Sequence, residues 1–294
     1  MKGEDHSIVP VGRSDLTTSG GSNPILDKMV RDALELAKAS TELAKASTEL
    51  AEDARVEFKC PNLEKAVRDE LWTPEGEIMR GDMLGLKKLG CSWCLEDSTK
   101  VSDLSGLQHA LNLTELWLTC NQITDISPLQ GLTNLTWLDL DDNQITDLSP
   151  LQGLTNLMQL NLRNNQNTDI SPLQGLTNLT ELRLQDNQIT DISPLLGLTN
   201  LTKLYLGGNQ ITEITPLQGL TNLGGLGLEG NQITDLTPLQ GLTKLTWLKL
   251  WGNQITDISP LQGLTNLTKL ELYSNQITDI SPLQGLTKLT GLWL

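Results

Sequence analysis

The chain has 294 residues and only 3% aromatic content, while Leu, Asn, Thr and Gln recur throughout, which is typical of a repeat array and not of a mixed globular core. Its formal net charge of -15 argues against nucleic acid and against an anionic membrane surface as partners, because both require a basic patch. With only His6 and His109, histidine-based catalysis has almost no material, so we predict that the chain is not an enzyme and needs no cofactor.

The N-terminal part divides into two predicted segments. Residues 1–22 are rich in Ser, Gly and Thr, which predicts a disordered lead-in, and they hold no apolar run long enough for a signal peptide, so we expect a cytoplasmic location. Pro24 suits a helix start, and Leu36, Leu43 and Leu50 recur every seven residues, so residues 23–56 are expected to form a helix. A solvated linker helix is favoured, and a weak coiled coil is the alternative.

Residues 57–112 are expected to form a helical cap and a degenerate first coil. Pro61 begins an amphipathic segment, NLEKAVRDEL, and Asp82 suits the cap of a second short helix. Stacked repeats need a terminal cap over their first core layer, which these helices would supply.

Residues 113–294 repeat every 22 residues, in eight full units that start at Leu113 and a partial ninth that starts at Leu289. Each unit approximates LTxLxLxxNQITDISPLQGLTN, in which LxxLxL predicts a short strand and the following Asn can satisfy backbone groups inside the turn. The TDISPL segment predicts a tight or 3-10 turn on the return side. The fold class is therefore an α/β-type leucine-rich-repeat solenoid, with a curved parallel sheet on its concave face.

The motif LTNLTWLDLDDNQITDLSPLQG, preceded by NLEKAVRDELWTPEGEIMRGDMLGLKKL and VSDLSGLQHALNLTEL, resembles the bacterial internalin-type leucine-rich repeats with their helical N-terminal cap. The resemblance covers roughly residues 57–294. It implies the binding of a protein ligand on the concave face.

Variation between the repeats points to the same face. The third, fifth, seventh and eighth positions of each unit change freely, and their side chains should face the concave surface. Five of the seven Trp and both Tyr fall there, and Trp, Tyr and Arg dominate protein-binding hot spots. The predicted partner-binding residues are Trp117, Trp137, Asp139, Asp141, Arg163, Arg183, Tyr205, Trp247, Trp251, Glu271, Tyr273 and Trp293.

This strip is expected to be divided. Asp139, Asp141 and Asp142 should gather near Arg163 and Arg183 in the first half, and Trp247, Trp251, Glu271 and Tyr273 should form a second cluster, with a bare patch at Gly224, Gly225 and Gly227 between them. The three Asp could hold calcium, but a solvated acidic patch is favoured because adjacent strand residues point alternately. The string GLGLEG at residues 225–230 matches a dinucleotide-binding pattern but lies on a repeat strand, so we regard it as a chance match.

Four cysteines, Cys60, Cys91, Cys94 and Cys120, include one CxxC pair and could bind zinc. We favour reduced, mostly buried thiols without a metal, with Cys91 at a core Leu position of the first coil. Asn167 stands where other units have Ile, which would place an amide in the core.

The favoured function is a protein-binding module. Because the chain ends at Leu294 inside a strand without a polar cap, we expect a fragment or a partner-capped protein. The alternatives are a regulatory or targeting segment of a larger multidomain protein, and a structural array that self-associates through the uncapped C-terminal coil.

Overall fold

The computed structural model describes residues 33–42, 45, 52–91 and 99–294. The chain divides into two compact units, Met1–Ala51 and Glu52–Leu294. In the first unit, residues 33–42 and 45 are helical with exposed side chains, which confirms the predicted helix for that stretch. The lead-in at residues 1–22 and the rest of the unit lie outside the described residues.

The second unit begins with the predicted cap. Helix α2 (Pro61–Leu71) buries Leu63 and Val67 and packs against strand β1 (Lys88–Gly90). Helix α3 (Arg80–Met83) follows, and the backbone N–H of Met79 donates to Asp82 Oδ2 at 2.8 Å, so Asp82 caps this helix as expected but from inside its first turn. No helix in the described ranges is long and apolar enough to cross a membrane.

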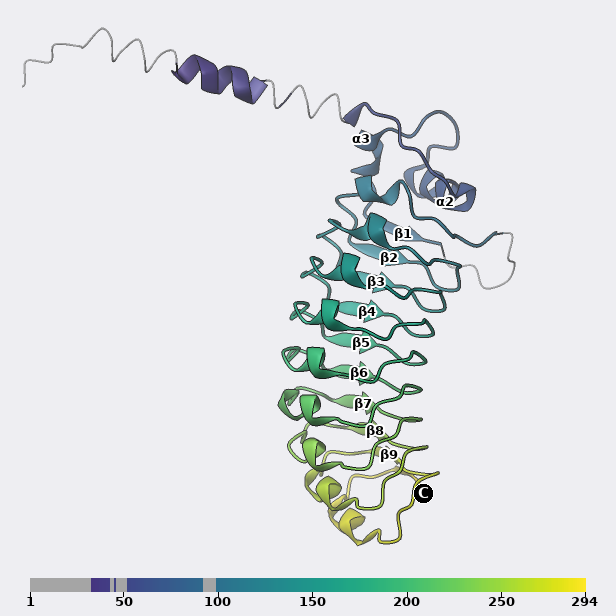
Figure 1. Ribbon diagram of the computed structural model, residues 1–294, viewed down its shortest axis with the longest axis vertical. Coiled ribbons are helices and arrows are strands. Elements are labelled where there is room, and N and C mark those ends of the chain that lie inside the picture. Colours follow the sequence, from purple (N-terminus) through teal and green to yellow (C-terminus); the bar gives the residue numbers. More distant parts are fainter. Residues whose placement is uncertain (1–32, 43–44, 46–51, 92–98) are drawn as a thin grey trace, which may run out of the picture. The chain divides into compact units, whose positions relative to one another are not determined.

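Ten parallel strands then form one sheet in chain order, and they stack along the length of the unit (Figure 1). From the second strand on, each strand residue pairs with the residue one repeat later, as Leu116 does with Leu138. After β1, the strands are β2 (Glu115–Trp117), β3 (Trp137–Asp139), β4 (Gln159–Asn161), β5 (Glu181–Arg183), β6 (Lys203–Tyr205), β7 (Gly225–Gly227), β8 (Trp247–Lys249), β9 (Lys269–Glu271) and β10 (Gly291–Trp293).

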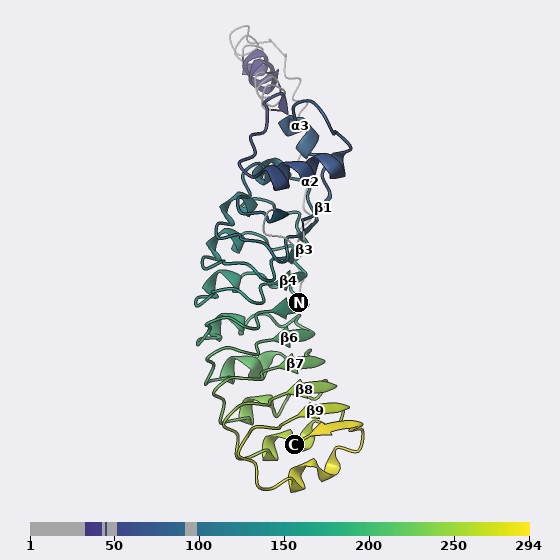
Figure 2. The ribbon, with the colours of Figure 1, turned by 90° about the vertical axis from the view of Figure 1, so that its right-hand side faces the viewer.

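Short 3-10 helices line the opposite, convex side, as the TDISPL segment predicts (Figure 2). The Ser127 N–H donates to Asp125 Oδ1 at 2.8 Å and its hydroxyl to Asp125 Oδ2 at 3.0 Å, and the following Pro fits the first turn. These helices are Leu107–His109, Ser127–Leu129, Ser149–Leu151, Ser171–Leu173, Ser193–Leu195, Thr215–Gly219, Thr237–Leu239, Ser259–Gly263 and Ser281–Gly285.

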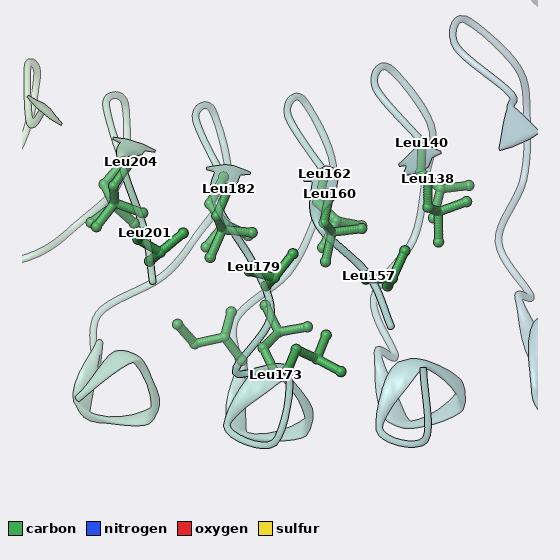
Figure 3. Close-up of a cluster of buried hydrophobic side chains, with 14 of the residues drawn as sticks. Leu138, Leu140, Leu157, Leu160, Leu162, Leu173, Leu179, Leu182, Leu201 and Leu204 are labelled. Carbon is green, nitrogen blue, oxygen red and sulfur yellow. The ribbon is translucent and has the colours of Figure 1, made fainter. Parts of the chain in front are cut away.

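Columns of Leu and Ile fill the space between the two sides. Leu138, Leu160 and Leu182 point inward from successive strands and are at most 1% exposed (Figure 3). Beside them runs the predicted column of Asn residues. Asn143 Nδ2 donates to Leu118 O at 2.9 Å and Leu140 O at 3.1 Å, and its Oδ1 accepts the Ile123 N–H at 3.0 Å. Each such Asn joins neighbouring repeats, so one repeat is incomplete without the next.

The cysteines depart from the prediction at one position. Cys60 and Cys91 are free and buried, and burial raises the pKa of the Cys91 thiol to about 12. Cys120 is disulfide-bonded, so the expectation of a reduced thiol is wrong there. Cys94 lies outside the described residues.

Candidate protein-binding surface

The strands present alternate side chains to opposite sides of the sheet. In β3, Leu138 is buried in the core while Trp137 and Asp139 face solvent. The same alternation, continued over the residues just after each strand, places the twelve predicted residues on one surface, the concave sheet face, and none of the twelve is buried. The repeat positions at which the sequence varies therefore lie on the concave sheet face, where most of their side chains reach solvent.

Six aromatic side chains on this face form three contacting pairs. The ring centroids of Trp117 and Trp137 lie 6.2 Å apart at an interplanar angle of 54°. Those of Tyr205 and Trp247 lie 5.2 Å apart at 30°, and those of Trp251 and Tyr273 lie 5.3 Å apart at 5°. Within the second cluster expected from the sequence, Trp251 stacks on Tyr273, while Trp247 contacts Tyr205, which was not expected in that cluster.

The expected bare patch on β7 does not exist. The indole of Trp247 lies where a side chain on Gly225 would stand, and it reaches across β7 to Tyr205 on β6. The carboxylate of Glu229 in turn lies over Gly207 and Gly227. Gly225 and Gly227 are consequently buried, since the missing side chains leave room that larger neighbours fill.

The Arg residues on this face pair with acids that the sequence did not single out. Arg183 Nη2 lies 2.7 Å from Glu181 Oε1, and Lys203 Nζ lies 3.2 Å from Glu181 Oε2. Burial alone would raise the pKa of Glu181, but the hydrogen bonds from the two cations outweigh it, so the pKa is lowered. The Arg183 guanidinium also lies over the Tyr205 ring, at 5.2 Å from its centroid.

Two of the three aspartates in the first half accept hydrogen bonds from amide side chains. Asp139 Oδ1 accepts from Asn161 Nδ2 at 3.1 Å, and Asp142 Oδ1 accepts from Asn164 Nδ2 at 2.7 Å. Burial raises the pKa of Asp141, with Asp139 and Asp142 adding to the rise and Arg163 opposing it.

The expected association of these aspartates with the two Arg side chains is only electrostatic. Arg163 makes its ion pair with Asp186, at 3.2 Å, and not with one of the three. Among the described residues, no group of three or more His, Cys, Asp or Glu could hold a metal ion.

Two depressions lie on the concave sheet face. A small one of about 90 Å³ is lined by Trp137, Asp139, Gln159, Leu160, Asn161, Glu181 and Arg183. A larger one of about 370 Å³ is lined by Tyr205, Trp247, Leu248, Lys249, Lys269, Glu271 and Trp293. Sequence reasoning missed Glu181, Glu229 and Lys269, although all three occupy variable repeat positions.

The string GLGLEG occupies β7 and the turn after it, as expected. The next helical segment is the short 3-10 helix Thr237–Leu239. A dinucleotide phosphate therefore has no helix N-terminus to bind at this position.

Comparisons with known proteins agree with this architecture. The family described as "Leucine Rich repeats (2 copies)" matches residues 133–175, 177–219, 199–241, 221–263, 243–285 and 265–294, and "Leucine Rich repeat" matches residues 109–126. A comparison with curated protein sequences gives no match.

Solved structures with the same fold include two internalins of Listeria monocytogenes. InlF is 36% identical with a TM-score of 0.68, over 81% of this chain and 76% of InlF. InlC2 is 39% identical with a TM-score of 0.62, over 80% of this chain and 93% of InlC2.

A plant receptor is also similar. The peptide hormone receptor RGFR1, in complex with RGF2, is 25% identical with a TM-score of 0.57, over 63% of this chain and 32% of the receptor.

Proposed function

Because the chain belongs to the bacterial internalin-type leucine-rich-repeat family, we propose that it binds a protein partner on its concave sheet face. The observation that carries the proposal is the three aromatic pairs, which stand on a solvent-facing sheet where no fold requirement places them. Aromatic side chains desolvate a large area at a small entropic cost, so they are effective anchors for a partner.

The dimensions of the face suit a protein. Ten strands spaced about 4.8 Å apart make a surface roughly 40 Å long, which is enough for an interface of standard size. Most charges on it are paired with one another, as Arg183 and Lys203 are with Glu181. Such internal pairs hold side chains in place before a partner arrives, which reduces the entropy lost on binding.

We also propose that the chain is a binding module and not an enzyme. Within the described ranges the single histidine is His109, which ends the first 3-10 helix, away from the sheet face. Burial lowers its pKa, so it is neutral at physiological pH. The similarity to RGFR1, which holds RGF2 in a complex, is consistent with a polypeptide partner.

The experiment compares two variants in partner capture from a lysate of the source organism. The first replaces Trp137, Trp247 and Trp251 by Ala, and the second, a control, replaces Trp72, which is 90% exposed in the cap. We expect a partner that the wild type and Trp72→Ala both retain and that the triple variant loses. The captured partner is then purified and its Kd measured for all three chains. Equal Kd values for the wild type and the triple variant would refute the proposal.

The same preparation tests self-association. Leu292, Trp293 and Leu294 are each more than 40% exposed on β10 and just after it. Sedimentation at several concentrations should reveal a mass increase if these residues join two copies. A constant monomer mass would remove this alternative.

The cytoplasmic location stays a prediction. The disulfide at Cys120 weighs against it, because disulfides are rare in the reducing cytosol. Fractionation of the source cells decides between the cytoplasm and an oxidising compartment.

A further inference from the structure

The larger depression on the concave sheet face combines aromatic walls with lysine side chains. It is lined by Tyr205 and Trp247, whose rings are in contact, and by Trp293, whose ring lies over Gly291. Lys249, Lys269 and Glu271 line the same depression. The depression is thus a partly desolvated space in which basic groups outnumber acidic ones.

The ion pairs of the face leave one cation unused. Lys88 pairs with Glu115 at 2.8 Å. Arg163 pairs with Asp186, and both Arg183 and Lys203 pair with Glu181. Lys249 has a loose contact with Glu271 at 4.0 Å. Among the described residues, Lys269 is the cation of this face without an ion pair, and its side chain is exposed at the mouth of the depression.

Glu229, an acid two repeats earlier in the chain, makes no ion pair with Lys269. Glu229 is turned onto Gly207 and Gly227, outside the lining of the depression, and one of its carboxylate oxygens is buried without a hydrogen-bond partner. An unpaired ammonium beside aromatic rings binds a carboxylate more strongly than it would in open water, because the rings exclude part of the solvent.

We propose that this depression binds an acidic side chain, Asp or Glu, of the protein partner, with Lys269 as its counter-ion. Trp247 and Trp293 cover the apolar part of that side chain and the partner residues next to it. The proposal rests on the proposed function. The net charge of -15 makes long-range attraction of a polyanion unfavourable, so recognition here is a local match of one carboxylate to one lysine.

The test uses peptides selected from a random-peptide display library on the immobilised wild-type chain, with amidated C-termini so that every carboxylate is a side chain. Each acidic residue of a selected peptide is then changed to its amide. Kd is measured on the wild type, on Lys269→Met, on Lys203→Met and on the chain with Trp137, Trp247 and Trp251 replaced by Ala. Lys203 is the matched control, because it occupies the same repeat position on β6 but is already paired with Glu181.

We expect one acid-to-amide change to weaken binding about tenfold on the wild type and on Lys203→Met, but less than about twofold on Lys269→Met. Two results would overturn this inference and leave the proposed function standing. In the first, peptides that depend on the Trp residues lose equal affinity on the wild type and on Lys269→Met when an acid is changed to its amide. In the second, the selected peptides contain no acidic residue. If no selected peptide depends on the three Trp residues replaced above, the proposed function fails, and the inference fails with it.

Discussion

Replacing Asn167 by Ile tests how the core of the solenoid is built. Asn167 is 0% exposed, at a position where the neighbouring repeats place Ile145 and Ile189, which are equally buried. Its Nδ2 donates to Asn187 Oδ1 at 2.8 Å, and the same oxygen accepts the Asn167 N–H at 2.9 Å. The Oδ1 of Asn167 itself is buried without a partner. The amide predicted from the sequence is therefore in the core and only half satisfied.

The expected gain follows from these contacts. An unsatisfied buried acceptor costs roughly 1–3 kcal/mol, and the larger apolar side chain of Ile adds about 1–2 kcal/mol of burial. The lost hydrogen bond from Nδ2 is worth about 1 kcal/mol. Asn187 Oδ1 keeps the backbone N–H of residue 167, as the equivalent Asn209 keeps that of Ile189, so no new orphan is created. We expect Asn167→Ile to stabilise the chain by about 2 kcal/mol.

Urea unfolding followed by circular dichroism measures the change. The midpoint should rise with an unchanged slope, and partner binding should stay the same because residue 167 lies in the core. The matched control is Ile189→Asn, which places the same amide in the next repeat and should lower the midpoint. An unchanged or lower midpoint for Asn167→Ile would contradict this prediction, since it would show that the site is adapted to Asn.

Three further predictions concern single residues. Gly225→Ala should force the Trp247 ring off β7, weaken its contact with Tyr205 by about 1 kcal/mol, and shift Trp fluorescence to the red. Gly224→Ala, whose added methyl would meet only Thr202 O at 3.7 Å, should change neither. Burial raises the pKa of Glu229 above its ordinary value of 4.5, so the folded chain holds this proton more tightly than the unfolded chain does, and stability falls as the pH rises above about 4.5. When urea midpoints are measured at increasing pH above about 4.5, Glu229→Gln should show a smaller decline than the wild type. An identical decline in both chains would contradict this prediction. With its pKa near 12, the buried Cys91 thiol should resist iodoacetamide in the folded chain and react once urea unfolds it, as read by mass spectrometry, whereas labelling of the folded chain would contradict this placement.

The periodicity of the sequence was sufficient to determine the architecture. A 22-residue repeat forces equivalent residues of adjacent units to become neighbours, so the pairing of Leu116 with Leu138 follows from spacing alone. The Asn column and the Asp–Ser turns are equally predictable, because their hydrogen bonds join residues at constant separations. The N-terminal cap was also recognised, from the amphipathic pattern of residues 61–71. The length of the strands was not predicted from the sequence, since only three residues in each unit pair with the neighbouring strands.

Sequence also determined which side chains reach the concave sheet face, because strand alternation is a local property. Only the tertiary structure decided which of them meet. Trp247 turns toward Tyr205 because Gly225 has no side chain to cover the intervening strand. Arg163 forms its ion pair with Asp186 and not with the three aspartates expected from the sequence. Which of these contacts forms depends on the rotamers and sizes of side chains in several adjacent repeats together. The repeat pattern places residues on a surface, but the space and charge left by neighbours set their direction along it.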